Sequence, residues 1–174
     1  WLVYHKGTGN THGVLLNEMT AKIDDATYFQ DTDPTSSVFS IGTADRCNKN
    51  NEDNIAFLWS EKQGFSKFGK FTGNGNANGP FIHLGFRPSW VVIRRVNDST
   101  HWQAQDNKRQ GFNSDNERLY LNDAAAEQTA NFIDLLSNGF KCITSDAGGN
   151  GNGGTYIYMA FAESPFVNSK GVPN

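Results

Sequence analysis

The stretch YIYMAFA, residues 156–162, decides the fold that this sequence predicts. Neighbouring side chains on a strand point to opposite faces of its sheet, and here both alternate sets are apolar or aromatic. A strand with this pattern is covered on both faces, so we expect it at the centre of the core. The stretch IAFLWS, residues 55–60, has the same pattern, and we expect a central strand there too.

These two stretches belong to an internal repeat. Setting Trp1 on Trp102 brings similar residues together along the chain, and one added residue extends the match through both apolar stretches. The matched pairs are Trp1/Trp102, Ser36/Ser137, Phe39/Phe140, Thr43/Thr144, Asp45/Asp146, Ile55/Ile157, Trp59/Phe161, Glu61/Glu163 and Phe65/Phe166. Residues 71–101 have no partner upstream. We therefore predict a partial first repeat over residues 1–70, the back part of a module, packed with a complete second repeat over residues 71–174.

Short runs rich in Val, Ile, Phe, Tyr and Thr alternate with Gly and Asn clusters, a pattern typical of antiparallel strands joined by loops. One helix is expected over Asp123–Phe132, where an Asp that can act as N-cap precedes strong helix formers. The predicted fold is an all-β antiparallel β-sandwich in jelly-roll or lectin-like style. The expected strands are Leu2–His5, Gly13–Leu16, Ala26–Gln30, Val38–Thr43, Ile55–Ser60, Phe68–Thr72, Phe81–Leu84, Trp90–Val96, His101–Gln105, Asp134–Leu136, Gly139–Thr144 and Tyr156–Ala162.

Charge and hydropathy argue against two kinds of partner. The formal net charge is -3 without a basic block, so no nucleic-acid partner is expected. No apolar run approaches the roughly 18–20 residues needed to span a bilayer, so no membrane insertion is expected. Cys47 and Cys142 take non-equivalent positions in the repeat, which predicts two free cysteines rather than a disulfide.

Three motifs carry a resemblance to a known group of proteins: FTGNG at residues 71–75, GFRP at residues 85–88 and AFAE at residues 160–163. With them, the whole chain resembles a repeat module of uncharacterised tail and fibre proteins of marine bacteriophages. The resemblance implies a virion protein of a tail or other surface appendage, facing the extracellular side, with a structural or host-adhesion role. By analogy with fibre proteins it also implies a homo-oligomer, of which a trimer is one form.

Motifs for catalysis do not stand out in the sequence. The histidines form no metal-ligand spacing, no nucleophile elbow or phosphate loop occurs, and no carboxylate pair is singled out as a glycosidase would require. We therefore expect no enzyme, no catalytic residue, no metal and no cofactor. Calcium at Asp31 and Asp33, or in the Asn-rich loop with Glu52 and Asp53, is the alternative. An Asx turn ahead of Pro34 explains the first pair more readily, and a solvated turn explains the second.

Candidate ligand-binding residues lie in loops, where aromatic rings and Asn or Asp side chains could contact a host surface glycan. Arg87 has two readings: a structural bridge to loop carbonyls or a carboxylate, which is favoured, or a ligand contact. Two other functions stay open, a carbohydrate-binding lectin-like domain outside any virion and a filament or capsid-decoration subunit. The candidate residues are Phe112, Tyr120, Asn113, Asp115 and Arg87.

Overall fold

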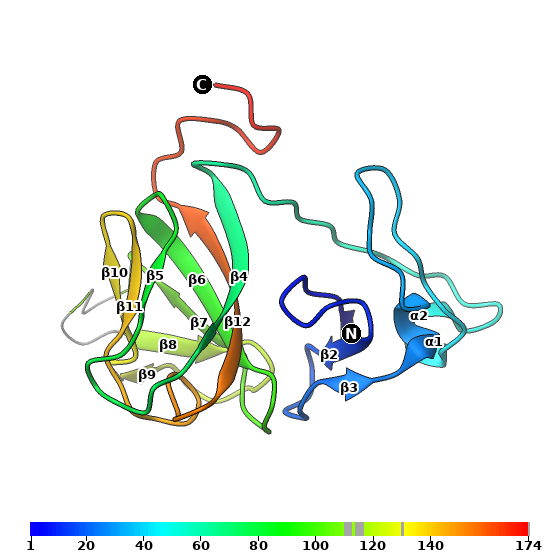
Figure 1. Ribbon diagram of the computed structural model, residues 1–174, viewed down its shortest axis with the longest axis horizontal. Helices are drawn as coiled ribbons and strands as arrows, with labels where there is room; N and C mark the ends of the chain where they lie inside the picture. The colour runs from blue at the N-terminus through cyan, green and yellow to red at the C-terminus, as the bar shows by residue number, and fades with distance from the viewer. Residues whose placement is uncertain (110–112, 114–116, 130, 174) are drawn as a thin grey trace.

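In the computed structural model of the protein, the described residues are 1–109, 113, 117–129 and 131–173. Their largest element is a six-stranded antiparallel sheet, in which the longest strands lie side by side (Figure 1). Its strands, in spatial order, are β4 (Ser66–Thr72), β12 (Thr155–Ala162), β6 (Pro88–Arg95), β7 (Gln103–Asp106), β8 (Glu117–Tyr120) and β9 (Gln128–Thr129).

A second antiparallel sheet covers one face of the first and completes a β-sandwich. It consists of β10 (Ile133–Leu136), β11 (Gly139–Cys142) and β5 (Phe81–His83), in that order. Apolar side chains from both sheets form the main core, among them Phe140 from the second sheet and Tyr156, Tyr158 and Ala160 from β12. The predicted all-β antiparallel sandwich is therefore confirmed, while its origin in a repeat stays a prediction.

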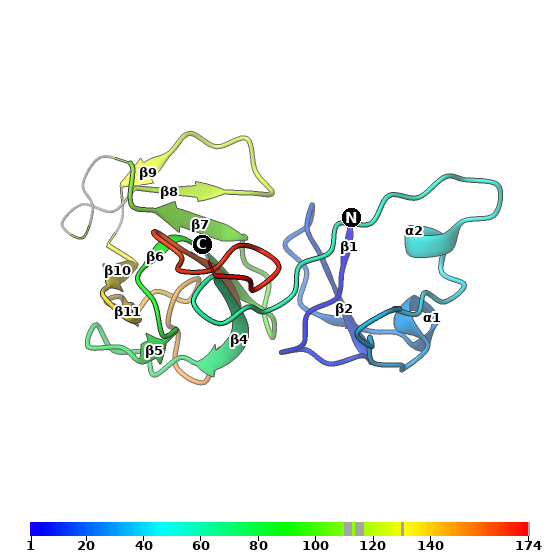
Figure 2. The ribbon, with the colours of Figure 1, turned by 90° about the horizontal axis from the view of Figure 1, so that it is seen from above.

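The N-terminal part of the chain covers the opposite face of the six-stranded sheet (Figures 1 and 2). It contains the small sheet β1 (Leu2–Val3), β2 (His12–Leu15) and β3 (Ile23–Asp24), followed by α1 (Ala26–Phe29) and α2 (Asp45–Asn48). Val14 packs against Ile157 and Trp102, and the Trp102 indole Nε1 donates a 2.9 Å hydrogen bond to the Leu15 carbonyl.

Both faces of β12 are consequently covered, as its sequence predicted. Tyr156, Tyr158 and Ala160 lie in the core between the sheets, whereas Ile157 and Met159 lie against the N-terminal part. The same layer buries Arg94 completely, and its Nη2 donates a 2.6 Å hydrogen bond to the Thr20 carbonyl. Burial lowers the pKa of Arg94 to about 10.

Two strand predictions in the N-terminal part are wrong for lack of neighbours. Ile55–Ser60 forms no strand and is exposed throughout, although its pattern predicted a central position. Val38–Thr43 also forms no strand and is mostly exposed. An apolar sequence becomes a strand only when another strand shares its backbone hydrogen bonds, and no strand in the described part of the chain pairs with either stretch.

Two further predictions are wrong because local hydrogen bonds or sheet pairing prevail. Ala26–Gln30, expected as a strand, contains helix α1, whose N-cap Asp25 accepts a hydrogen bond from the Thr27 backbone. Asp123–Phe132, expected as a helix, contains strand β9 instead, because Gln128 pairs with Arg118 of β8. No helix within the described ranges is both long and apolar enough to cross a membrane.

The expected boundary between residues 70 and 71 falls inside β4, which belongs to the sandwich. The Gly- and Asn-rich loops expected at residues 73–79 and 147–154 are joined at one buried side chain. The Asn150 amide donates to Asn74 Oδ1 and to the carbonyls of Asn76 and Thr144, each within 2.9 Å.

Both cysteines are free, as predicted. Cys142 is fully buried in the core between the sheets, and that burial raises the pKa of its thiol to about 12. Cys47 is half-buried and lies in α2. A thiol with so high a pKa is inert, so Cys142 acts as a small apolar core residue.

Candidate functional site

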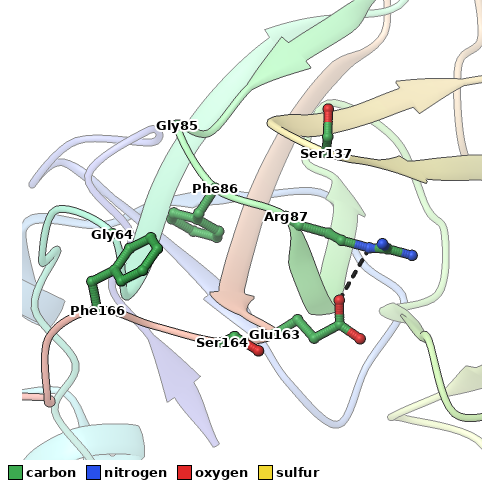
Figure 3. A pocket seen from close by; sticks show the side chains of 8 residues that line it. All are labelled: Gly64, Gly85, Phe86, Arg87, Ser137, Glu163, Ser164 and Phe166. Carbon is green, nitrogen blue, oxygen red and sulfur yellow. Dashed lines mark ion pairs between the residues drawn. The ribbon is translucent and has the colours of Figure 1, made fainter. Parts of the chain in front are cut away.

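An open cleft lies where the turn between β5 and β6 meets the chain that leaves β12 (Figure 3). Its volume is about 310 Å³. Four polar side chains, two phenylalanines and two glycines line it: Gly64, Gly85, Phe86, Arg87, Ser137, Glu163, Ser164 and Phe166. They come from four separate parts of the chain, which the two sheets bring together.

Backbone hydrogen bonds fix the position of Arg87 at the cleft. The N–H groups of Leu84 and Gly85 both donate to the Asn138 carbonyl, which ties the β5–β6 turn to the tip of the β10–β11 hairpin. Gly85 has a φ of 84°, a left-handed conformation that glycine adopts without strain. On the β12 side of the cleft, the Glu163 N–H donates a 2.9 Å hydrogen bond to the Arg87 carbonyl.

The side chains of these two residues form an ion pair in which Arg87 Nε lies 3.1 Å from Glu163 Oε2 (Figure 3). The other carboxylate oxygen of Glu163 accepts a 2.6 Å hydrogen bond from Asn107 Nδ2, and Lys108 Nζ lies 3.8 Å away. Arg87 is about half-exposed and Glu163 less so, which limits what the pair contributes to stability. The arrangement places hydrogen-bonding groups of fixed orientation at the cleft wall.

Phe166 supplies the apolar surface. It is 86% exposed, the highest value among the large hydrophobic residues described. It borders a second hollow of about 390 Å³ as well, lined with Gln63, Val167 and Gly171. Phe86, in contrast, is half-buried and packs against the main core. An exposed aromatic ring beside polar groups offers one surface for stacking and another for hydrogen bonds.

Of the residues that the sequence singled out for ligand binding, Arg87 alone lines this cleft among the residues described. It pairs with a carboxylate, as its structural reading expected. Tyr120 lies at the other end of the sheet, where it pairs with Gln103 and stacks on His101 with ring centroids 4.1 Å apart. Phe112 and Asp115 lie outside the described residues.

Asn113 has a scaffolding contact. Its side-chain Nδ2 donates a 2.9 Å hydrogen bond to the Leu135 carbonyl, and its Oδ1 accepts a 2.8 Å hydrogen bond from the Leu135 N–H. Both bonds imitate a neighbouring strand at the edge of β10, in a residue with a φ of 61°. The structure therefore does not bring Arg87, Asn113 and Tyr120 together into one site.

Sequence reasoning missed Glu163, Ser137, Ser164 and Phe166 as cleft residues. A signal was present, because the GFRP motif contains Arg87 and the AFAE motif ends at Glu163, the two partners of the cleft's ion pair. What the sequence did not show was the pairing of Pro88 with Ala162, which brings these motif ends together.

The acidic residues considered for calcium have other contacts. The Asp31 carbonyl accepts a hydrogen bond from Asn10, and Asp33 accepts one from the Tyr4 hydroxyl at 3.4 Å. Within the part of the chain that the structure describes, no group of three or more His, Cys, Asp or Glu side chains could hold a metal ion. Calcium binding at these residues stays an untested alternative.

Fold and cleft together define an all-β sandwich module with an open, partly aromatic surface cleft. The chain belongs to a family described as a domain of unknown function (DUF7483), whose model matches residues 1–165. No curated protein and no solved structure matches the chain.

Proposed function

We propose that this protein is a non-enzymatic module of a bacteriophage tail or fibre protein that contributes to virion architecture and to adhesion at the host surface. Its location is the virion, in a tail or surface appendage, and it works as a homo-oligomer. The ligand is a glycan of the host surface, bound at the cleft between Arg87 and Phe166. The observation that carries the adhesion role is the exposed Phe166 ring in the same cleft as the Arg87–Glu163 pair.

The chemistry of the cleft suits a sugar ring. The apolar face of a pyranose stacks on a flat aromatic ring such as Phe166, while its hydroxyls exchange hydrogen bonds with charged and hydroxyl side chains. Glu163 and the hydroxyls of Ser137 and Ser164 supply such groups at the cleft. A shallow, open cleft fits the end of a chain or a branch rather than an enclosed small molecule.

A binding role agrees better with this cleft than hydrolysis does. Glycosidases place two carboxyl groups across the scissile bond. Glu163 is the single carboxylate among the described lining residues, and its oxygens are engaged by Arg87 and Asn107. The cleft thus offers an ion pair for recognition, and a depolymerase activity is not part of the proposal.

The test is a glycan array probed with the 174-residue chain, followed by titration of the best ligand against variants. Phe166→Ala and Arg87→Ala should each weaken binding about tenfold or more, which corresponds to roughly 1.4 kcal/mol. Val38→Ala, an exposed position in the N-terminal part, is the matched control and should bind normally. Unchanged affinity in both cleft variants would mean that the ligand binds elsewhere on the protein. No binding to any glycan on the array and no adsorption to host cells would refute the adhesion role.

The exposed apolar residues of the N-terminal part favour a second candidate, a filament or capsid-decoration subunit. That role predicts assembly without glycan binding. A lectin-like domain outside any virion is the remaining alternative, and it predicts that isolated monomers bind defined sugars. Adsorption to host cells, glycan binding and assembly state, measured on the same preparation, separate the three.

A further inference from the structure

The segment of residues 55–60, called here the 55–60 segment, leaves large apolar side chains in solvent. Ile55, Phe57, Leu58 and Trp59 are between 59% and 74% exposed, and no strand pairs with any of the six residues. Figure 1 shows this part of the chain as a long trace between α2 and β4. Contiguous exposed apolar side chains of this size mark an interaction surface.

The internal repeat indicates what kind of surface this is. Ile55 matches Ile157 and Trp59 matches Phe161, so the 55–60 segment corresponds to β12. In the sandwich, β12 pairs antiparallel with β4 along seven residues. A segment with the sequence pattern of β12 is therefore suited to pair antiparallel with a strand of the β4 kind, with Phe57 on one face and Leu58 on the other.

Such a strand has a free edge in this structure. β4 is the first strand of the six-stranded sheet, with β12 on one side and, among the described residues, no strand on the other. Ser66 exchanges both backbone hydrogen bonds with Lys62, while the Phe65 carbonyl accepts a hydrogen bond from the N–H of Ala162, the last residue of β12. The backbone N–H and C=O groups of successive residues point to alternate edges of a strand. Those of Phe68 and Lys70 therefore point to the free edge, as those of Ser66 do.

Charge agrees with an antiparallel arrangement at this edge. Glu52 and Asp53 precede the 55–60 segment, and Lys67 and Lys70 lie on β4. In an antiparallel pair the acidic end of the segment meets the Lys70 end of β4. Asp53 and Lys70 are both exposed, so their charges are available to a partner. Complementary charges of this kind set orientation and register.

We propose that the 55–60 segment of one copy of this chain adds as an antiparallel strand to the free edge of β4 in a second copy. Backbone hydrogen bonds at the edge supply affinity, and the apolar side chains supply specificity. Donor and acceptor surfaces differ, so the contact is head-to-tail and generates a closed ring or a filament. It does not rest on glycan binding, because it uses no residue of the Arg87 cleft.

Analytical ultracentrifugation of the full chain over a range of concentrations tests the proposal. The wild type should sediment as an assembly that dissociates on dilution. Leu58→Asp, on the donor segment, should raise the dissociation constant at least about tenfold. Lys70→Pro should do the same, since it removes an N–H that points to the free edge and leaves the bonds to β12 in place. Val38→Asp, exposed but outside both strands, is the control and should assemble normally.

Disulfide trapping then identifies the contact. Ile55→Cys and Lys70→Cys are introduced into separate chains that also carry Cys47→Ser, because Ile55 matches Ile157 and Ile157 lies opposite Lys70 in the β12–β4 pair. The two preparations are mixed and oxidised. A cross-linked pair of chains forming only in the mixture supports the proposal. A wild type that stays monomeric at every concentration overturns it. So does a chain carrying both cysteines that cross-links only within itself, since the segment would then fold back on its own β4.

Discussion

Strand β12 and the 55–60 segment have nearly the same sequence pattern and opposite surroundings. β12 is paired on both edges, with β4 and with β6, and apolar residues cover both of its faces. The 55–60 segment has no pairing and is exposed along its whole length. The difference shows that an apolar alternation states what a strand can bury, whereas its neighbours decide whether it becomes a strand.

The two matched tryptophans show the same difference. Trp102 is buried and donates its indole N–H to the Leu15 carbonyl. Trp1 is exposed and contacts Phe57, with ring centroids 5.8 Å apart. Matched positions in the two parts therefore allow paired substitutions in which chemistry is constant and surroundings vary.

The largest effect is expected for the tryptophan pair. Trp102→Ala should lower the free energy of unfolding by about 3–5 kcal/mol, because it opens a cavity between the N-terminal part and the sheet. Trp1→Ala should change it by about 0.5 kcal/mol or less. Urea unfolding followed by circular dichroism, at a concentration where the chain is monomeric, measures both. Equal losses in the two variants would show that Trp1 is buried in solution.

The isoleucine pair should give the next largest difference. Ile157→Ala in β12 removes a buried side chain from the layer between the sheet and the N-terminal part and should cost about 2–5 kcal/mol. Ile55→Ala should be neutral within about 0.5 kcal/mol in the monomer. The same unfolding experiment applies. A loss for Ile55→Ala that persists on dilution would contradict the exposure of the 55–60 segment.

Much of the sandwich was predictable because its central strands contain continuous apolar runs, as β6 and β12 do. β8 and β9 were missed for a physical reason: the sequences ERLY and QT have no apolar alternation. They become strands by pairing outward from β7. Local sequence favours α1 through the Asp25 cap, a signal that the strand prediction overlooked.

The cleft was predictable only in part. Arg87 was singled out, and Glu163 ends a motif that was recognised, but their contact depends on strand register over a long sequence separation. Phe166 follows β12 without any pattern that would separate it from a core phenylalanine. Exposure of a single aromatic residue is set by tertiary structure, which a local pattern does not contain.

The Asn-rich loops give a third matched pair, of smaller expected effect. Asn150→Ala leaves the loop around residues 73–79 without its buried partner and should lower the free energy of unfolding by about 1–3 kcal/mol. Asn50→Ala should have no measurable effect, because Asn50 lies in the exposed loop of residues 49–54, which precedes the 55–60 segment as the Asn150 loop precedes β12. Thermal unfolding of both variants measures the difference. Equal stability would mean that other contacts hold the two loops together.

The smallest effect concerns the junction of the two regions and depends on pH. The Gly7 N–H donates a 2.9 Å hydrogen bond to Nδ1 of His5, so Nδ1 is an acceptor and carries no proton. The proton of the neutral ring is therefore on Nε2, which donates a 3.1 Å hydrogen bond to the Tyr158 carbonyl. Burial lowers the pKa of His5, because removing the ring from water disfavours its charged form. Because the pKa is lowered, the neutral His5 ring contributes its full stabilisation above the pKa of about 6.5 that it has in the unfolded chain. This stabilisation is lost as the pH falls through the lower pKa of the folded protein.

Stability should accordingly decrease between about pH 7.5 and pH 5, and the part due to His5 should be about 1 kcal/mol, the contribution of one hydrogen bond. In His5→Gln this part of the pH dependence should vanish, whereas His83→Gln, at an exposed position, should keep it. Urea titrations at both pH values measure the difference.

Because His5 joins the N-terminal part to β12, protonation should loosen that junction before it affects the core between the sheets. Tryptophan fluorescence, which reports on Trp102 at the junction, should therefore change at a higher pH than the circular dichroism of the strands. Coincident transitions would instead show that the two regions unfold as one unit, and that the N-terminal part, despite its exposed segment, is an integral layer of the sandwich.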